Sequence, residues 1–475
     1  MKKYVLLIIL LLMIPITVNA ETATNLSKKS TYRINNLRTN KLNDNSYKTY
    51  NTVNAATEIE ISSKQDISHI YIIYELNSQK GILKTKYDTI ILGTNGFLHE
   101  YQKLNTPVKN LSIKYTKSVK ISEIRVYSTG DVPSDVQIWK RESKTDLMVF
   151  STHADDEVLF FGGLIPLYLN QGKKVHVVYM CRHDIGKFKK TARLHEQLNG
   201  LWALGVTDYP TFGIIPDNYS KPSKKTPKEI EKTYNVAESQ LIQAGFTNDD
   251  IVKFDVREIR KYQPKVIVGH DDNGEYGHGQ HLVNNRTLKD AVRMAALPSY
   301  KVDNLPAYIV SKLYIHLYDK KNWTVLDLDK PLSKYNGKTA YEMTKLGFKE
   351  HQSQQKTWFL GWLNGKKNEF TKATQIKSYN PMYWGLYYSA VGPDINKNDL
   401  FENIISEEST SPISEEIGMT TFTTTTTTSE KRQNIINSII RRNKERKDNN
   451  VMMSVAVGLF TLVIIFYIIF KKQEV

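Results

Sequence analysis

Residues 147–157 read Leu-Met-Val-Phe-Ser-Thr-His-Ala-Asp-Asp-Glu, an apolar run that ends in one imidazole and three carboxylates. The apolar part, 147–150, is typical of a short buried β-strand. Carboxylates rarely gather at the inner end of a strand unless a cation neutralises them. The alternative is an ordinary helix amino terminus, where Asp and Glu satisfy free amides and the helix dipole. That alternative explains the carboxylates but gives His153 no role.

A second polar cluster follows another apolar run further along the chain. The run 266–268 precedes 276–281, which read Tyr-Gly-His-Gly-Gln-His. His278 and His281 fall at the start of a predicted helix, at a spacing that puts them on one face. Carboxyl ends of parallel strands meet at one sheet edge, where α/β folds bind ligands. The two clusters together therefore predict a catalytic zinc or iron site with spare acid and base groups.

The pattern around these clusters predicts an α/β domain. From residue 146 onward, short apolar stretches alternate with longer stretches of helical periodicity. Such alternation is typical of parallel β-α-β units, so we expect a Rossmann-like, mostly parallel sheet with helices on both faces. A single long helix is predicted over 157–170, and later strands at the edge of the sheet are predicted over 313–328 and 383–390.

The residues before this domain have a different pattern. Over 21–50 the chain is polar and rich in Asn, Lys, Ser and Thr, which predicts a flexible lead-in. Over 51–140, short β-branched runs of period two are separated by Asn and Gly, which predicts a small all-β sandwich. Its last run, 121–128, resembles the closing strands of galactose-binding-like (discoidin-type) modules. A carbohydrate-binding role and a purely spacing role both fit this pattern.

The two ends of the chain predict export and anchoring. Residues 1–20 have a basic start, an apolar core and a small-x-small cleavage site, as in a secretory signal peptide. A Ser/Thr-rich stalk and basic segment at 400–450 leads to 451–470, which carries no charge and is long enough to be a transmembrane helix. The basic segment would favour the reverse orientation. Because translocation begins before the last segment is made, we expect a single-pass carboxy-terminal anchor with an extracytoplasmic catalytic domain.

The composition gives further indications of the cellular location and of the partners. Cys181 is the only cysteine, so no intramolecular disulfide can form, and for an exported protein this favours a bacterial cell surface. The formal net charge of +16 suits contact with an anionic cell-wall polymer, whereas the predicted export argues against nucleic acid. A basic surface with no specific partner is the alternative.

Both polar clusters resemble those of a known family. The run 153–157, His-Ala-Asp-Asp-Glu, resembles the His-Pro/Ala-Asp-Asp-Glu signature of PIG-L/LmbE-like zinc-dependent N-acetylglucosaminyl deacetylases. The run 278–281, His-Gly-Gln-His, is similar to their distal His-x-x-His. Between them, 193–196 resembles an Arg-x-x-Glu segment, and 351–354 resembles a His-x-Ser-Gln element. The resemblance covers 145–395 and implies an LmbE-like fold.

The resemblance implies a metal site with named ligands. His153, Asp156 and His281 would hold Zn²⁺, with Fe²⁺ as the alternative metal. Asp155 would be the general base that activates the attacking water. One departure bears on the ligands: Gln280 stands where some relatives carry Asp, which leaves the carboxylate partner of the neighbouring histidine open.

The resemblance also implies roles around the substrate. The Tyr276 hydroxyl would help to stabilise the oxyanion, and His278 would help to protonate the departing amine. Arg193 would face the sugar. Later aromatic residues such as Trp358 and Trp362 could stack on a sugar, although ordinary core packing is the alternative.

The sequence as a whole predicts an extracytoplasmic, metal-dependent N-deacetylase that removes the acetyl group from N-acetylglucosamine-type sugars of a glycan or glycoconjugate. The alternative is a cell-surface glycan-binding protein whose deacetylase domain is vestigial. The intact set of histidines and carboxylates favours the enzyme, because a retired site has no reason to keep unpaired carboxylates.

Overall fold

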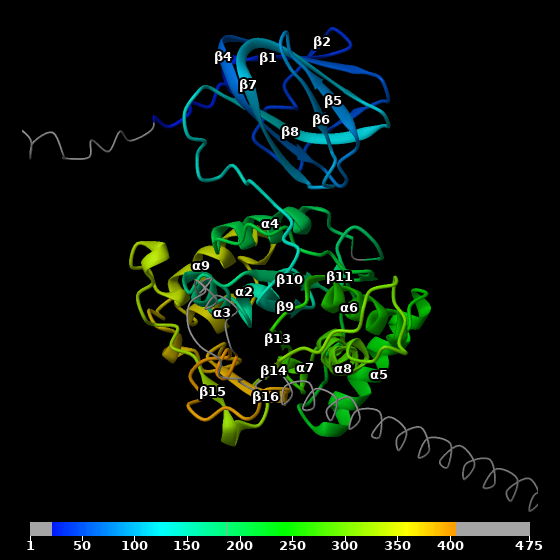
Figure 1. The fold of residues 1–475 in the computed structure, drawn as a ribbon, viewed down its shortest axis with the longest axis vertical. Helices are drawn as coiled ribbons and strands as arrows, with labels where there is room; N and C mark the ends of the chain where they lie inside the picture. Colours follow the sequence, from blue (N-terminus) through cyan, green and yellow to red (C-terminus); the bar gives the residue numbers. More distant parts are fainter. Residues whose placement is uncertain (1–20, 188, 405–475) are drawn as a thin grey trace, which may run out of the picture. The chain divides into compact units, whose positions relative to one another are not determined.

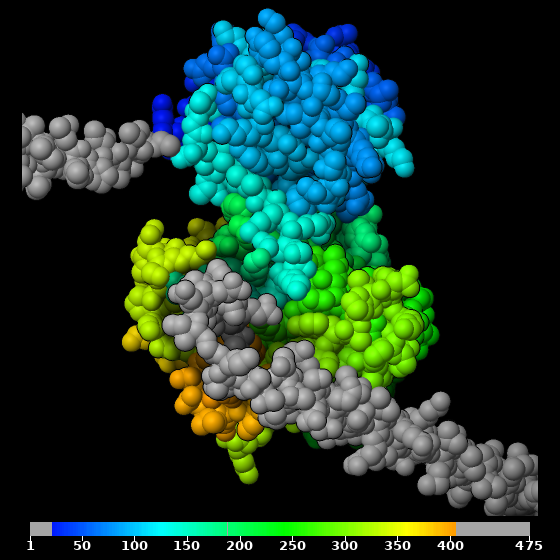
Figure 2. Space-filling model, viewed as in Figure 1, coloured from blue at the N-terminus to red at the C-terminus, as the bar shows by residue number. Residues whose placement is uncertain are grey.

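The computed structural model describes residues 21–187 and 189–404, which belong to two compact units. The amino-terminal unit contains residues 21–141 together with 190–198 and 207–209. The carboxy-terminal unit contains the other described residues. Figure 1 shows the elements of each unit, and Figure 2 shows one face of their surfaces in the same colours.

The amino-terminal unit is built on one antiparallel sheet of eight strands in which β4 is central. The order is β2-β1-β4-β7-β5-β6, and β8 pairs with both β4 and β3. The pairing of β4 with β7 shifts register after Ser62. On its other edge, the first half of β4 pairs with β1 and the second half pairs with β8. The strands are β1 (Thr31–Ile34), β2 (Leu37–Thr39), β3 (Asn51–Val53), β4 (Glu58–Tyr74), β5 (Gly81–Lys84), β6 (Thr89–Leu92), β7 (His99–Tyr115) and β8 (Val119–Tyr127).

This all-β organisation agrees with the period-two pattern of 51–140, and the two-layer sandwich stays a prediction. The flexible lead-in over 21–50 is wrong in part, because β1 and β2 lie there and β1 pairs with β4. Leu26 and Tyr32 are buried, and the Tyr32 hydroxyl donates a hydrogen bond to the Ile124 carbonyl at 2.9 Å. A few well-placed apolar side chains thus anchor a segment whose average composition is polar.

The carboxy-terminal unit contains a six-stranded mixed sheet in the order β10-β9-β13-β14-β16-β15. The first four strands are parallel, and β16 is antiparallel to both of its neighbours. The mostly parallel α/β sheet is therefore confirmed. A separate parallel pair joins β11 (Cys181–Arg182) to β12 (Ile215–Pro216). The six strands are β9 (Leu147–Ser151), β10 (Val175–Tyr179), β13 (Val266–Gly269), β14 (Lys312–His316), β15 (Thr324–Val325) and β16 (Tyr383–Ser389).

Helices flank this sheet on two sides (Figure 1): α2, α3 and α9 lie on one side, and α5, α6 and α8 on the other. Within the described residues, the α-helices are α2 (Asp156–Leu159), α3 (Leu164–Asn170), α4 (Ala192–Ala203), α5 (Pro227–Gln243), α6 (Asn248–Tyr262), α7 (Gly274–Gly277), α8 (Gly279–Ala295), α9 (Ala340–Glu350) and α10 (Leu360–Asn364). Short 3₁₀ turns are η1 (Ser27–Lys29), η2 (Lys320–Asn322), η3 (Ser333–Tyr335), η4 (Gln352–Gln354) and η5 (Ala373–Gln375).

The single helix predicted over 157–170 is instead two helices, α2 and α3, separated by a turn at Gly162. A Cβ on Gly162 would lie 2.6 Å from both Thr344 Cγ2 and the Val158 carbonyl oxygen. The chain therefore needs glycine where α9 approaches closely, and glycine also weakens a continuous helix.

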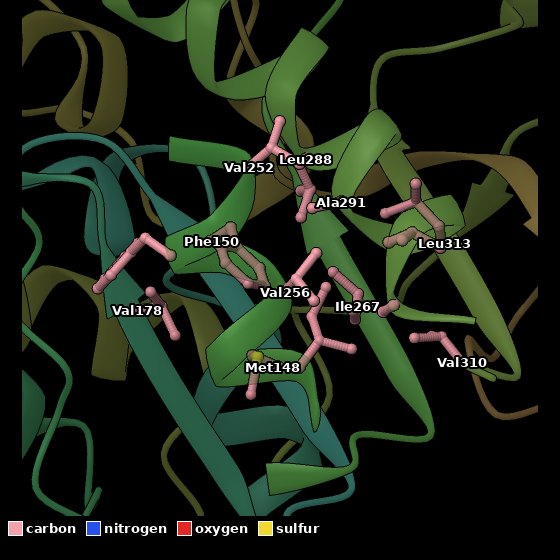
Figure 3. Close-up of a cluster of buried hydrophobic side chains, with 14 of the residues drawn as sticks. Met148, Phe150, Val178, Val252, Val256, Ile267, Leu288, Ala291, Val310 and Leu313 are labelled. Carbon is pink, nitrogen blue, oxygen red and sulfur yellow. The ribbon is translucent and has the colours of Figure 1, made fainter. Parts of the chain in front are cut away.

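An apolar core holds the strands that end at the polar clusters (Figure 3). Met148 of β9 lies opposite Ile267 of β13 in register, and both belong to one buried cluster with Leu288 and Ala291 of α8. Full burial of each large aliphatic side chain contributes about 1.5–3 kcal/mol. This packing fixes the carboxyl ends of β9 and β13 beside each other, with α8 directly behind them.

The predicted localisation requires a correction. Within the part of the chain that the structure describes, no helix combines the length and the apolar character that a membrane span needs. For the described residues, this finding contradicts the prediction of a single-pass membrane protein with an extracytoplasmic catalytic domain. The signal peptide predicted over 1–20 and the helix predicted over 451–470 lie outside the described residues, as does the predicted stalk beyond residue 404.

Candidate active site

The two polar clusters meet at the carboxyl edge of the parallel sheet. The loop after β9 carries the run 153–157, and the segment after β13 carries 276–281. Because β9 and β13 are parallel neighbours, both segments leave the sheet at the same edge. The structure thus brings together the two clusters that the sequence placed far apart.

Three donor atoms form a small triangle at this edge. His153 Nδ1 lies 3.2 Å from Asp156 Oδ2 and 3.2 Å from His281 Nε2, and the last two atoms are 3.1 Å apart. Tetrahedral zinc with bonds of about 2.0–2.1 Å separates its ligand atoms by about 3.3 Å. The residues predicted as ligands therefore fit a metal ion in donor type and in spacing, and all three are buried.

The electrostatics of the triangle also favour a cation. Burial would raise the pKa of the Asp156 carboxyl, but His281 and His153 hold that pKa well below its usual range. Burial would lower the pKa of His281, but Asp156 and Glu275 raise it to about 9. The same negative charge that keeps a proton on His281 suits a divalent metal in place of that proton.

Glu275 is a central part of the site that the sequence did not reveal. Its Oε2 lies 2.7 Å from His281 Nδ1 and 3.0 Å from His270 Nδ1. Its Oε1 lies 3.2 Å from His316 Nδ1 and accepts the Asp271 backbone N–H at 3.1 Å. A carboxylate on Nδ1 leaves the Nε2 lone pair of His281 facing the triangle, as in known carboxylate–histidine–metal arrangements.

Gln280 orients the His153 imidazole, as Glu275 orients that of His281. Its Nε2 donates to the Pro216 carbonyl at 2.9 Å, which turns its Oε1 toward His153 Nε2, also at 2.9 Å. The same Oε1 accepts the Asn218 N–H at 2.9 Å. His153 therefore carries its hydrogen on Nε2 and presents Nδ1 to the triangle. The partner of the neighbouring histidine, left open by the sequence, is Glu275.

Side chains hold the ligand loop along its backbone. Four consecutive backbone N–H groups donate to side-chain acceptors: Thr152 to His270 Nε2 (3.1 Å), His153 to Asp156 Oδ2 (2.8 Å), Ala154 to His183 Nε2 (3.1 Å) and Asp155 to Glu157 Oε2 (2.8 Å). Because His270 and His183 accept backbone hydrogens through Nε2, they position the loop and are poor candidates for metal ligands.

The predicted acid, His278, lies beside the triangle, and the predicted base, Asp155, precedes Asp156 in the ligand loop. Asp155 is buried and has a φ of 99°, a strained backbone for a residue other than glycine. The His278 ring lies 4.5 Å from the His153 ring, and its Nδ1 accepts the Gln280 N–H at the start of α8. Burial and the neighbouring imidazoles lower the pKa of His278 well below its usual range, so the ring is neutral with its hydrogen on Nε2.

Tyr276 closes the site on the side of His278 and His281. Its ring lies 5.4 Å from the His278 ring and 5.5 Å from the His281 ring. Burial raises the pKa of its hydroxyl well above the usual value, with the carboxylates of Asp156 and Asp155 adding to the effect. The hydroxyl therefore keeps its proton and can donate a hydrogen bond to an oxyanion.

A comparison with known families covers this region. The family described as PIG-L, GlcNAc-PI de-N-acetylase, matches residues 148–292, which include both polar clusters. Residues 148–292 form a PIG-L domain. The match contains the whole donor triangle together with Glu275 and Gln280, so the resemblance inferred from the sequence is confirmed.

Curated relatives of the PIG-L domain are deacetylases. A 1D-myo-inositol 2-acetamido-2-deoxy-alpha-D-glucopyranoside deacetylase of Geodermatophilus obscurus is 29% identical over 187 residues, 35% of this chain and 60% of that protein. A protein of the same name, deacetylase 1 of Catenulispora acidiphila, is 25% identical over 183 residues, 35% of this chain and 54% of that protein. The chain thus spans little more than half the length of these relatives.

Among solved structures, N,N'-diacetylchitobiose deacetylase from Pyrococcus horikoshii is similar at 15% identity. The match covers 51% of this chain and 83% of that chain, with a TM-score of 0.33.

Two further motif residues support the fold. His351, from the run 351–354 beyond the PIG-L match, places its Nε2 2.6 Å from Glu157 Oε1, and both side chains are buried. Glu157 thus links the ligand loop to the end of α9.

His195 lies in the amino-terminal unit, where its Nδ1 is 2.8 Å from His99 Nε2. Arg193 lies in the same segment of α4, so its role toward the sugar stays a prediction.

Replacing Glu275 by Gln tests the role of the carboxylate that contacts His281 Nδ1. Loss of its negative charge removes the strong acceptor from His281 Nδ1 while the shape of the side chain is kept. We expect metal affinity to fall about 10–100-fold. Competition with a fluorescent chelator measures this, and Glu231→Gln, at an exposed surface ion pair with Arg286, is the matched control. Unchanged affinity in Glu275→Gln would contradict the role given to this residue.

Proposed function

We propose that the protein is a metal-dependent N-deacetylase that hydrolyses the acetamido group of N-acetylglucosamine-type sugars. The observation that carries the proposal is the donor triangle of His153, Asp156 and His281, with a buried Asp155 at the position before Asp156 in the ligand loop. Further support comes from the PIG-L match and from relatives that are named as deacetylases of an acetamido sugar linked to inositol.

The metal ion, Zn²⁺ or Fe²⁺, would be held by His153 Nδ1, Asp156 Oδ2 and His281 Nε2, and when bound it supplies a Lewis acid and a more acidic water. Asp155 takes one proton from the attacking water as the new C–O bond forms. The Tyr276 hydroxyl donates a hydrogen bond to the oxyanion.

The last step breaks the bond between carbon and nitrogen. His278 is neutral and carries its hydrogen on Nε2, so it donates a hydrogen bond to the departing nitrogen. Asp155 then delivers to that nitrogen the proton taken from water, which leaves acetate and a free amino sugar. This division of labour refines the role expected for His278, since a neutral imidazole orients the leaving group and Asp155 moves the proton.

Acetate release from purified protein tests the proposal. The metal-loaded protein is incubated with N-acetylglucosamine, its β-1,4-linked oligomers and its inositol glycoside, with and without chelator. We expect equal amounts of acetate and free amine from at least one of these substrates, loss of both with chelator, and recovery on addition of Zn²⁺ or Fe²⁺. Absence of acetate from the whole panel would refute the enzyme. Glycan binding without acetate release would favour the alternative of a vestigial domain.

A further inference from the structure

A cluster of aromatic rings leads outward from the metal site within the carboxy-terminal unit. The Tyr276 ring lies 5.2 Å from Trp362, 5.7 Å from Trp358 and 6.0 Å from Phe359. The Tyr276 ring also lies 5.5 Å from the His281 ring. Trp358 is 53% exposed. One tyrosine therefore separates an exposed indole from an imidazole of the donor triangle.

The cluster is packed on itself and is anchored at its inner end. Trp358 meets Trp362 edge to face at 4.4 Å, and Trp362 lies 4.8 Å from Tyr379. Phe160, the residue directly after α2, lies 6.0 Å from Trp362 and 5.7 Å from His281. Edge-to-face contacts of this kind hold rings in fixed orientations. The aromatic cluster thus reaches the end of α2, the helix that begins with Asp156.

Ordinary core packing accounts for the inner rings but not for Trp358. A buried ring gains from the apolar area that it removes from water, whereas Trp358 leaves half of its surface exposed. Single exposed apolar residues are common on protein surfaces. This one, however, belongs to a continuous set of rings that ends at the donor triangle. Its position is better explained by contact with something that also reaches that triangle.

Two lysine side chains lie at the edge of this aromatic cluster. Lys221 Nζ lies 5.9 Å from the centre of the Trp358 ring. Lys225 Nζ lies 5.0 Å from the centre of the Tyr379 ring and hydrogen-bonds to the Tyr379 hydroxyl. An apolar ring face edged by hydrogen-bond donors suits a sugar, whose C–H groups present an apolar face and whose hydroxyls surround it.

Resting on the proposed function, we propose that Trp358 stacks on the sugar ring adjacent to the one that loses its acetyl group. With the acetamido group at the donor triangle beside Tyr276, the next ring of the substrate reaches the exposed indole. The substrate class is therefore an oligosaccharide or glycoside with a second ring linked to the acetamido sugar. Trp358 is a specificity residue and does not touch the reacting atoms.

Trp358→Ala tests this by comparing two substrates. We expect kcat/KM for the β-1,4-linked disaccharide of N-acetylglucosamine to fall about tenfold more than kcat/KM for the monosaccharide, mainly through KM. Trp358→Phe keeps a ring and should restore most of the preference. Tyr387→Ala is the matched control, because Tyr387 is an aromatic residue of the same unit, 43% exposed, whose ring contacts Tyr318. It should leave the ratio unchanged.

A binding measurement separates this proposal from the proposed function. Calorimetric titration of the disaccharide into metal-loaded Asp155→Asn protein should show affinity about tenfold weaker when Trp358→Ala is added. Weaker binding together with no acetate from the wild type would keep the stacking site and refute the deacetylase. Two results would overturn the stacking site. One is an unchanged ratio of kcat/KM between disaccharide and monosaccharide, and the other is no disaccharide binding by the parent protein. Thermal unfolding of each variant checks that it is folded.

Discussion

Replacing Asp155 by Asn is expected to lower kcat for deacetylation by a factor of about 100 to 10,000 while the protein still binds its metal. Asn has nearly the same shape, and the Asp155 backbone N–H that donates to Glu157 is kept. The amide cannot accept the proton of the attacking water, so only the base is lost. Acetate release under saturating substrate measures kcat, and elemental analysis of the same sample measures the metal content.

Asp156→Asn is the matched comparison at the next position. Asp156 Oδ2 lies within 3.2 Å of both ligand imidazole nitrogens and also accepts the His153 N–H, so its charge belongs to the metal site. We expect this variant to lose metal and activity together. Full activity in Asp155→Asn would refute the base assignment. Loss of metal in Asp155→Asn would instead make Asp155 a ligand.

The sheet of the carboxy-terminal unit could be predicted because its strands are short, apolar and separated by helical stretches. Such a pattern allows few arrangements besides parallel β-α-β units. The flexible lead-in predicted over 21–50 was wrong in part, because the structure there depends on a distant segment. Tyr32 and Leu26 are isolated apolar residues in a polar stretch, and β1 gains its stability by pairing with β4. Such pairing depends on a distant partner, so local composition does not report it.

The triangle could be predicted because its residues lie in two short motifs that follow two strands. The role of Glu275 could not be predicted, because it depends on contacts with three histidines that belong to different elements of the fold. His270 follows β13, His281 lies in α8 and His316 ends β14. Only the strand order places β14 beside β13 and so brings His316 to Glu275. The positive φ of Glu275, 55°, gives no signal in the sequence, since that backbone is usual for glycine or asparagine.

The affinity of the site for its metal is expected to rise at least about tenfold for each pH unit between about pH 6 and 8, because the pKa values of both ligand imidazoles, His281 and His153, are raised. The sign follows from His281, whose pKa is raised above the usual value to about 9 by Asp156 and Glu275 despite burial. In the metal-free protein that imidazole therefore carries a proton throughout this range. Binding must release the proton, and each tenfold fall in proton concentration favours the metal-bound form tenfold.

The Glu275→Gln variant tests whether the Glu275 carboxylate contributes to this dependence of metal affinity on pH. Removing the Glu275 charge takes away part of what raises the pKa of His281, so the imidazole loses its proton at lower pH. The rise of affinity with pH should then level off earlier than in the wild type. Chelator competition across the same pH range measures both curves, with the affinity of the chelator corrected for its own protonation. A wild-type affinity that does not change with pH would mean that His281 binds the metal without releasing a proton, contrary to the charge balance of the buried triangle.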